Sequence, residues 1–278
     1  MPYADLGDFR LHYVDIGPDD ESRIDYPPVV FLHGFTLDHR QWREVVPFFR
    51  RRYRVILMDA RGHGLSDAPE TGYSRAHRVD DLARFVDTLN IGRFHLVGLS
   101  MGGSTAIAYA FRHQACLESL TLASSSAAGW NIGTKMKRIE QQAREKEIAE
   151  SQEKGLEFIR RKWIDYSLAF FEKTGKEPPE MLVTMMQEHS GAPWMDERRG
   201  RYPAPGIDLD RVHGIDVPTL ILAGGQDKIF SALAVELHRR IPDNRLKVYR
   251  QTGHMLNMER PDRFNQDLAD FLSELEAQ

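Results

Sequence analysis

The hydrophobic pattern of the chain alternates between short apolar runs and amphipathic stretches. A short apolar run is typical of a strand that is buried on both faces of a parallel sheet. The segment from Arg78 to Leu89, by contrast, places Val79, Leu82 and Phe85 on one helical stripe. Strands that alternate with helices predict an α/β fold. The predicted strands are 9–16, 29–32, 55–58, 94–98, 117–123, 220–223 and 246–249.

The pattern changes after Ala127. A long, charged stretch follows, and no strand-like run interrupts it before the apolar pattern resumes near the C-terminus. Apolar residues recur at helical spacing within this stretch, for example Leu156, Ile159 and Trp163. The predicted division is a core domain of residues 1–126 and 211–278 and an inserted helical cap (lid) of residues 127–210.

A serine lies where an apolar run gives way to a helix-like run. Ser100 is the centre of the pentapeptide GLSMG at residues 98–102, directly after a predicted strand. A serine at a sharp strand-to-helix turn is held in a strained conformation, and glycines on both sides leave room for neighbouring backbone. The start of the helix directs unpaired amide groups toward a developing oxyanion. Ser100 is therefore a candidate nucleophile, with an ordinary turn serine as the alternative.

Two downstream residues could activate this serine. A serine nucleophile needs a base, and the base needs an acid that fixes its tautomer. Asp227 follows the apolar run 219–223 and is the candidate acid, although it could instead cap a helix that begins near Ser231. His254 lies in a loop ahead of a helix opened by Pro261 and is the candidate base. The order Ser, Asp, His along the chain belongs to one fold.

With two further motifs, the chain resembles the α/β-hydrolase superfamily, in its carboxylesterase-like branch with a serine nucleophile. Residues 29–35 read VVFLHGF, which is similar to the family's strand and His-Gly oxyanion loop, and residues 59–67 read DARGHGLSD. The resemblance runs nearly end to end. It implies a mostly parallel twisted sheet with helices on both faces and an inserted helical cap over the active site. It also implies an oxyanion hole formed by the backbone amides of Phe35 and Met101.

Three polar residues of these motifs are expected to have structural roles. His33 and His63 are expected to hold loop backbone by hydrogen bonds, and Asp59 is expected to anchor a turn. The histidines show no His-x-x-x-His or Cys-rich spacing, and no Gly-rich phosphate loop is present. We therefore expect neither a metal nor a cofactor.

The cap supplies candidates for the substrate pocket. Its aromatic and methionine residues would either line the pocket or pack the cap against the core domain. The candidates for substrate binding are Trp130, Trp163, Phe170 and Met185.

The expected reaction is hydrolysis of carboxylic esters of small molecules through an acyl-enzyme. A lactonase or enol-lactonase is the first alternative, because a lactone is a cyclic ester. Hydrolysis of a carbon–carbon bond is a further alternative. It is disfavoured, because hydrolases of this kind usually resemble one another in a tryptophan after the catalytic histidine, where this chain has Met255. A receptor that retains the triad and turns over one ligand slowly is a further alternative.

Composition excludes several other classes of protein. The 278 residues include 37 basic and 41 acidic ones, a net charge of −4, which lacks the basic excess of a nucleic-acid-binding protein. No apolar run approaches a membrane span, and the first residues lack a signal-peptide pattern, so a cytoplasmic location is expected. Cys116 is the single cysteine, so no intrachain disulfide can form. The sequence gives no indication of oligomeric state.

Overall fold

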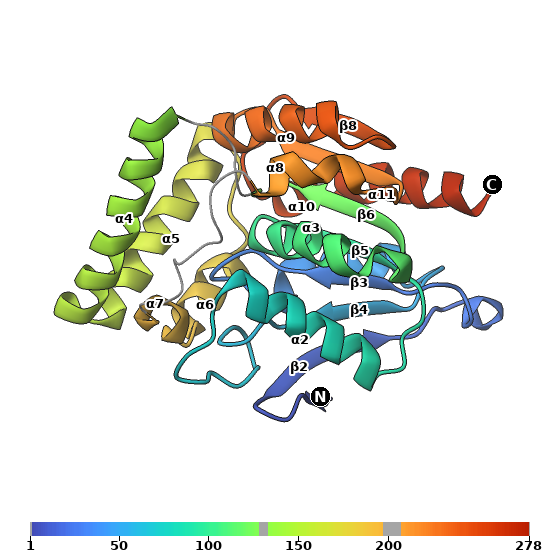
Figure 1. The fold of residues 1–278 in the computed structure, drawn as a ribbon, viewed down its shortest axis with the longest axis horizontal. Coiled ribbons are helices and arrows are strands. Elements are labelled where there is room, and N and C mark those ends of the chain that lie inside the picture. Colours follow the sequence, from blue (N-terminus) through green and yellow to red (C-terminus); the bar gives the residue numbers. More distant parts are fainter. Residues whose placement is uncertain (1, 128–132, 197–206, 278) are drawn as a thin grey trace.

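A computed structural model describes residues 2–127, 133–196 and 207–277 of the chain. Its centre is an eight-stranded sheet in the order β1-β2-β4-β3-β5-β6-β7-β8 (Figure 1). The first two strand pairs, β1 with β2 and β2 with β4, are antiparallel, and all the others are parallel. The strands are β1 (Tyr3–Asp5), β2 (Arg10–Ile16), β3 (Val29–Leu32), β4 (Val55–Met58), β5 (Phe94–Leu99), β6 (Leu117–Ala123), β7 (Thr219–Gly224) and β8 (Asn244–Tyr249). The α/β fold expected from the alternating pattern is confirmed.

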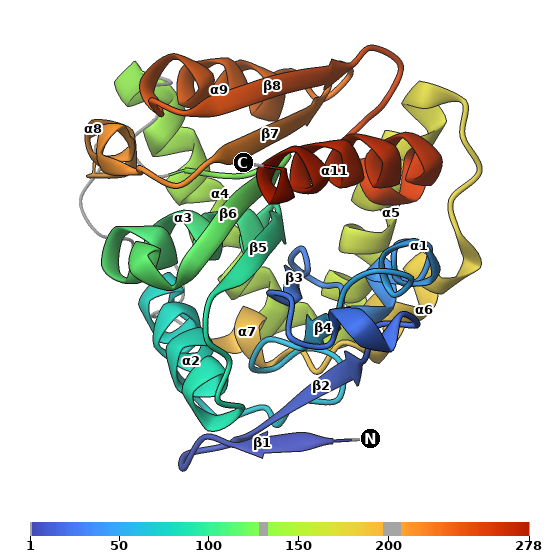
Figure 2. The same ribbon diagram turned by 90° about the vertical axis from the view of Figure 1, so that its right-hand side faces the viewer.

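Helices cover both faces of this sheet, because successive strand residues point to opposite sides. Val30 and Leu32 of β3 pack on one face, under α2 (Arg75–Thr88), α3 (Met101–His113) and α9 (Lys228–Arg240). Val29 and Phe31 pack on the other face. Figure 2 shows α1 (Val46–Phe49) and α11 (Pro261–Glu276) on that side. The two apolar layers bury every residue of β3, β4 and β5, so these strands are shielded from water on both faces.

Most of the helices between β6 and β7 lie apart from the sheet. The described helices between these two strands are α4 (Gly133–Lys154), α5 (Leu156–Thr174), α6 (Glu180–Glu188), α7 (Ala192–Met195) and α8 (Ile207–Arg211). Figure 1 shows α4 beside α5 at one end of the molecule. α8 packs instead against α3 and α9 of the sheet layer. None of the described helices is both long and apolar enough to cross a membrane.

The structure adds short elements to the expected pattern. β1, the 3-10 helices η1 (Glu21–Arg23), η2 (His39–Trp42), η3 (Gln114–Cys116) and η4 (Val212–Gly214), and helix α10 (Leu256–Glu259) were not expected. Helix α9 begins at Lys228 and not near Ser231, because the Asp227 side chain caps it by accepting a hydrogen bond from the Phe230 amide. β1, the 3-10 helices and α10 are too short to show a hydrophobic period, so their sequence pattern does not identify them.

The packing of α3 on the sheet can be tested at Gly102. A Cβ added there would collide with the carbonyl oxygen of Leu32, which is backbone and cannot move aside cheaply. We expect Gly102→Ala to lower the free energy of unfolding by about 1–3 kcal/mol, measured by urea denaturation. The control is Gly92→Ala, because a Cβ at this exposed glycine would meet nothing within 4 Å. Equal stability of the two variants would contradict the close contact.

Candidate active site

Ser100 occupies a strained turn between β5 and α3. Its backbone has φ 54° and ψ −106°, in the left-handed half of φ space that a side chain rarely adopts. The turn is tight because Gly98 approaches the next helical turn, where an added Cβ would lie 2.5 Å from the carbonyl carbon of Gly102. Strain of this kind persists only where the surrounding structure enforces it, and it is concentrated at functional sites. Ser100 itself is half-buried.

Asp227 and His254 lie together at the same edge of the sheet. Asp227 follows β7, His254 follows β8, and the carboxyl ends of parallel strands meet at one edge. The two side chains are joined by a hydrogen bond of 2.6 Å between His254 Nδ1 and Asp227 Oδ2. A carboxylate only accepts, so Nδ1 carries the proton, and in a neutral imidazole Nε2 then keeps a free lone pair. The other carboxylate oxygen accepts from the Phe230 amide at 3.4 Å, so the capping role and the contact with histidine coexist.

Two aromatic rings contact the imidazole of His254. Phe170 of α5 stacks on it, with 5.5 Å between ring centroids and 28° between ring planes. Phe230, in the first turn of α9, lies 4.5 Å from it in a tilted arrangement. These rings and Asp227 restrict the imidazole from several sides. Phe170 is one of the predicted pocket residues, and the structure places it against the candidate base.

The loop after β3 is held by polar side chains. His33 Nδ1 bonds the carbonyl of Gly34 at 2.7 Å, and its Nε2 accepts from the Ala60 amide at 3.0 Å. Gln41 Oε1 accepts from the Gly34 amide at 2.8 Å. His63 Nδ1 lies 3.0 Å from the carbonyl of Arg61, and burial lowers the pKa of both histidines, which keeps them neutral near pH 7. The structural roles expected for His33 and His63 are confirmed.

Sequence reasoning missed the role of Gln41. Its backbone carbonyl accepts from the side chain of Asn257 at 2.8 Å, and the side-chain amides of the two residues lie 3.4 Å apart. Asn257 lies in α10, three residues after His254. The pair therefore connects the loop after β3 to the segment that carries His254. The two residues are far apart in the sequence, so no local pattern signals this contact.

The two predicted oxyanion donors come from different segments of the chain. Met101 is the first residue of α3, a position whose amide has no acceptor within the helix. Phe35 follows Gly34 in the loop after β3, and its ring makes edge contacts with His63 at 5.6 Å and Trp163 at 5.1 Å. The next residue, Thr36, has φ 68°, a second strained position near the site.

The four predicted pocket residues have different environments. Trp163 of α5 contacts the Phe35 ring, and its indole nitrogen donates to Glu147. Met185 is 1% exposed and packs in an apolar cluster with Leu37 and Phe171, the packing role that the sequence left open. Trp130 lies outside the described residues. Substrate contact at these positions stays a prediction.

Asp59 anchors several segments, as expected. Its carboxylate is fully buried and accepts from the backbone amides of His39 at 2.7 Å and Leu65 at 3.1 Å. The Nδ1 atoms of His12 and His39 lie 2.8 and 2.9 Å from Oδ2. Burial raises the pKa of Asp59, but the hydrogen bonds from the two histidines outweigh it and hold that pKa far below its usual range.

These three side chains also bear on metal binding. Within the described part of the chain, His12, His39 and Asp59 are the one group of three whose ligand atoms all lie within 4.8 Å of one another. Asp59 already accepts hydrogen bonds from both rings, so the cluster is accounted for without an ion. Positions 12, 39 and 59 are widely spaced in the chain, so they form no local ligand motif.

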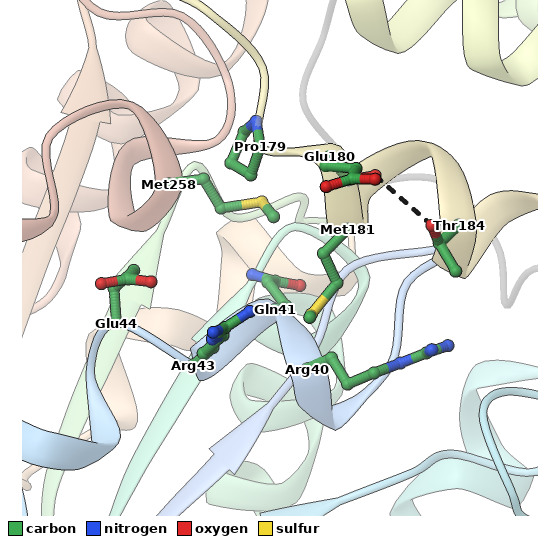
Figure 3. A pocket seen from close by; sticks show the side chains of 9 residues that line it. All are labelled: Arg40, Gln41, Arg43, Glu44, Pro179, Glu180, Met181, Thr184 and Met258. Atoms are coloured by element: carbon green, nitrogen blue, oxygen red, sulfur yellow. Dashed lines mark hydrogen bonds between the residues drawn. The ribbon is translucent and has the colours of Figure 1, made fainter.

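A cavity of about 220 Å³ opens beside η2 (Figure 3). Arg40, Gln41 and Arg43 line one side, and Met181 of α6 and Met258 of α10 line another. Ser100, Asp227 and His254 do not contribute to its wall. Gln41 lines this cavity and also accepts the hydrogen bond from the Gly34 amide in the loop after β3.

Known proteins are similar in sequence to most of this chain. Residues 29–267 match the model of the Alpha/beta hydrolase family. The AB hydrolase superfamily protein YisY of Bacillus subtilis is 32% identical over 88% of this chain and 91% of its own length. The 3-oxoadipate enol-lactonase 1 of Acinetobacter baylyi is 26% identical, with 90% of each chain covered.

Two solved structures have a fold similar to that of this chain over nearly its whole length. MenH from S. aureus superposes with a TM-score of 0.82 at 27% identity, covering 95% of this chain and 99% of its own. A thermophilic esterase from Thermogutta terrifontis gives a TM-score of 0.76 at 26% identity, covering 96% of this chain and 94% of its own.

The cluster around Asp59 predicts a pH-dependent contribution of His39 to stability. Burial lowers the pKa of His39. The hydrogen bond and charge of Asp59 and the charge of Asp38 raise it by more, so the pKa in the folded protein lies above the ordinary value of 6.5. Because its pKa is raised on folding, protonated His39 stabilises the folded protein. This stabilisation is complete when the pH is below the ordinary pKa of histidine, and it is lost as the pH rises through the pKa of His39 in the folded protein. We expect His39→Gln to lower the free energy of unfolding more at pH 6 than at pH 9, measured by urea denaturation.

The matched control is His213→Gln, at an exposed histidine, which should change stability little at either pH. A loss in His39→Gln that is the same at both pH values would contradict the charged pairing with Asp59.

Proposed function

The chain belongs to the alpha/beta hydrolase family, and we propose that it is a serine hydrolase that cleaves carboxylic esters of small molecules. The observation that carries this proposal is the 2.6 Å hydrogen bond between His254 and Asp227, at the sheet edge where Ser100 occupies a strained turn. The nucleophile, the acid and the base then follow β5, β7 and β8, in the chain order typical of this fold.

In the proposed mechanism, His254 Nε2 takes the proton of the Ser100 hydroxyl as Oγ bonds to the ester carbonyl carbon. The carbonyl π electrons move to oxygen and give a tetrahedral oxyanion. When that intermediate collapses, the bond to the alcohol oxygen breaks, and the departing alcohol takes the proton from His254. Water repeats the same steps on the acyl-enzyme and releases the acid. Asp227 keeps Nδ1 protonated and stabilises the imidazolium.

The amides of Phe35 and Met101 are proposed to bind the oxyanion. Met101 begins α3, so its amide is also favoured by the positive end of the helix dipole. Gln41 and His33 hold the loop that carries Phe35. A donor fixed before the reaction is worth on the order of a hundredfold or more in rate.

We propose that α4 to α7 form the cap over this site. Two contacts support it: Trp163 of α5 touches the Phe35 ring, and Phe170 of the same helix stacks on His254. Trp163 and Phe170 would then border the acyl or alcohol pocket.

Hydrolysis of an enol-lactone is the second candidate. The similarity to an enol-lactonase over 90% of each chain favours it, and the chemistry is the same attack on a cyclic ester. Cleavage of carbon–carbon bonds is less favoured because Met255 follows the histidine. A slow receptor would share the triad but not the multiple turnover.

The proposal predicts turnover of p-nitrophenyl esters and its loss in Ser100→Ala. Initial rates over increasing acyl length should show many turnovers for the wild type and a drop of about a thousandfold or more in the variant. Ser104→Ala is the matched control, since Ser104 lies one turn further along α3 and should leave the rate nearly unchanged.

A panel of small lactones run in parallel separates the two candidates. Faster turnover of lactones than of esters would replace the ester proposal by the lactonase. An active Ser100→Ala variant would remove Ser100 from the mechanism, and a lack of repeated turnover on both panels would favour the receptor.

A further inference from the structure

We propose that Glu259 is a positioning residue that holds the loop of His254 and, through Thr174, makes the orientation of the base depend on helix α5. This inference rests on the proposed function, because it takes His254 as the base. Glu259 lies at the end of α10, five residues after His254, and is 5% exposed.

The carboxylate of Glu259 binds the backbone on both sides of His254. Oε2 accepts from the Gly253 amide at 2.7 Å, and Oε1 accepts from the Met255 amide at 3.2 Å. Because these two amides flank the histidine, they fix the peptide planes that set the direction of its side chain. Hydrogen bonds from backbone amides to a buried charged carboxylate are stronger than those to a neutral acceptor.

The carboxylate of Glu259 also packs directly against the backbone of Gly253. A Cβ added at Gly253 would lie 2.9 Å from Oε1 of Glu259 and 3.4 Å from the Cβ of Phe170. The backbone of Gly253 is therefore packed between Glu259 and α5. A loop packed in this way cannot shift unless one of these partners shifts with it.

Helix α5 contacts this loop at two places on one face. Phe170 and Thr174 are four residues apart, so they lie one above the other on the helix. Phe170 stacks on the imidazole, and the Thr174 hydroxyl lies 3.0 Å from Oε2 of Glu259. The same hydroxyl lies 3.1 and 3.3 Å from the carbonyls of Phe171 and Phe170. It carries one proton, and Glu259 is the nearest acceptor.

These contacts connect α5, which we propose as part of the cap, to the base. A displacement of α5 would break the ring stacking and the hydrogen bond together, because both come from one rigid helical face. The Glu259 carboxylate would then lose one of its three donors while still holding the two amides. Without these two contacts the imidazole of His254 would be held less precisely. The catalytic step would then slow, because a small misplacement of a reacting group lowers the rate even when binding is unchanged.

The test removes the hydroxyl and keeps the shape of the side chain. We expect Thr174→Val to lower kcat about three- to tenfold for a short p-nitrophenyl ester, with KM within about twofold. Thr174→Ser retains the hydroxyl and should restore most of kcat. The matched control is Thr184→Val in α6, where the hydroxyl meets the carbonyl of Glu180 and does not reach the loop. It should match the wild type.

A double-mutant cycle identifies Glu259 as the partner. Glu259→Gln should reduce kcat more than Thr174→Val, and adding Thr174→Val to it should cause little further loss. Where Glu259→Gln fails to fold, the single threonine variants still decide the question. Additive losses, or unchanged kcat in Thr174→Val together with a lowered melting temperature, would overturn the proposal and leave a purely structural contact.

A second readout separates this inference from the proposed function. The rate at which a small fluorophosphonate modifies Ser100 depends on the base but needs no particular ester. No modification of wild-type Ser100 would refute the proposed function. Modification at the same rate in the wild type and in Thr174→Val would refute the positioning role alone, and slower modification in Thr174→Val, restored in Thr174→Ser, would support it.

Discussion

The close approach of helix α3 to the sheet at Ser100 is the constraint on which the site depends. The helix begins directly after β5, and this is possible because Gly98, Gly102 and Gly103 have no Cβ where neighbouring atoms already lie. The turn forces φ 54° on Ser100 and directs the first amides of α3 toward the sheet edge. Since β7 and β8 run parallel to β5, their following loops reach the same edge. The location of the site is therefore a consequence of sheet topology and of one glycine-rich turn.

Buried carboxylates organise the loops at this edge in a common way. Asp59 accepts two backbone amides, Glu259 accepts two more, and Asp227 accepts one while it binds His254. Burying a carboxylate is costly unless donors surround it, and loop amides need acceptors when they leave the sheet. The amides supply the donors that the carboxylates require, and the carboxylates supply the acceptors that the amides require. The result is that the loops and the helix starts at this edge are fixed by buried carboxylates, which is what positioning of reacting groups requires.

The sequence predicted the sheet well because its strands are buried on both faces. Val29–Leu32 and Val55–Met58 appear with the predicted bounds, since a continuous apolar run leaves little choice of end. Leu117–Ala123 also has the predicted bounds, although polar residues interrupt its apolar ones. The pairing of Asp227 with His254 was also anticipated from chain order, although their catalytic roles stay a prediction. The contacts of Gln41 with Asn257, of His12 with Asp59 and of Thr174 with Glu259 were not anticipated. Each joins segments that are distant in the chain, so no spacing or periodicity encodes them.

The central claim is that Ser100, His254 and the amides of Phe35 and Met101 act on one acyl group. The most direct measurement is a crystal structure of the protein after reaction with a small phosphonate, whose phosphorus mimics the tetrahedral intermediate. The account predicts a covalent bond to Ser100 Oγ, with the phosphoryl oxygen about 2.7–3.1 Å from both amide nitrogens. Modification of another residue, or a phosphoryl oxygen directed away from these amides, would contradict it.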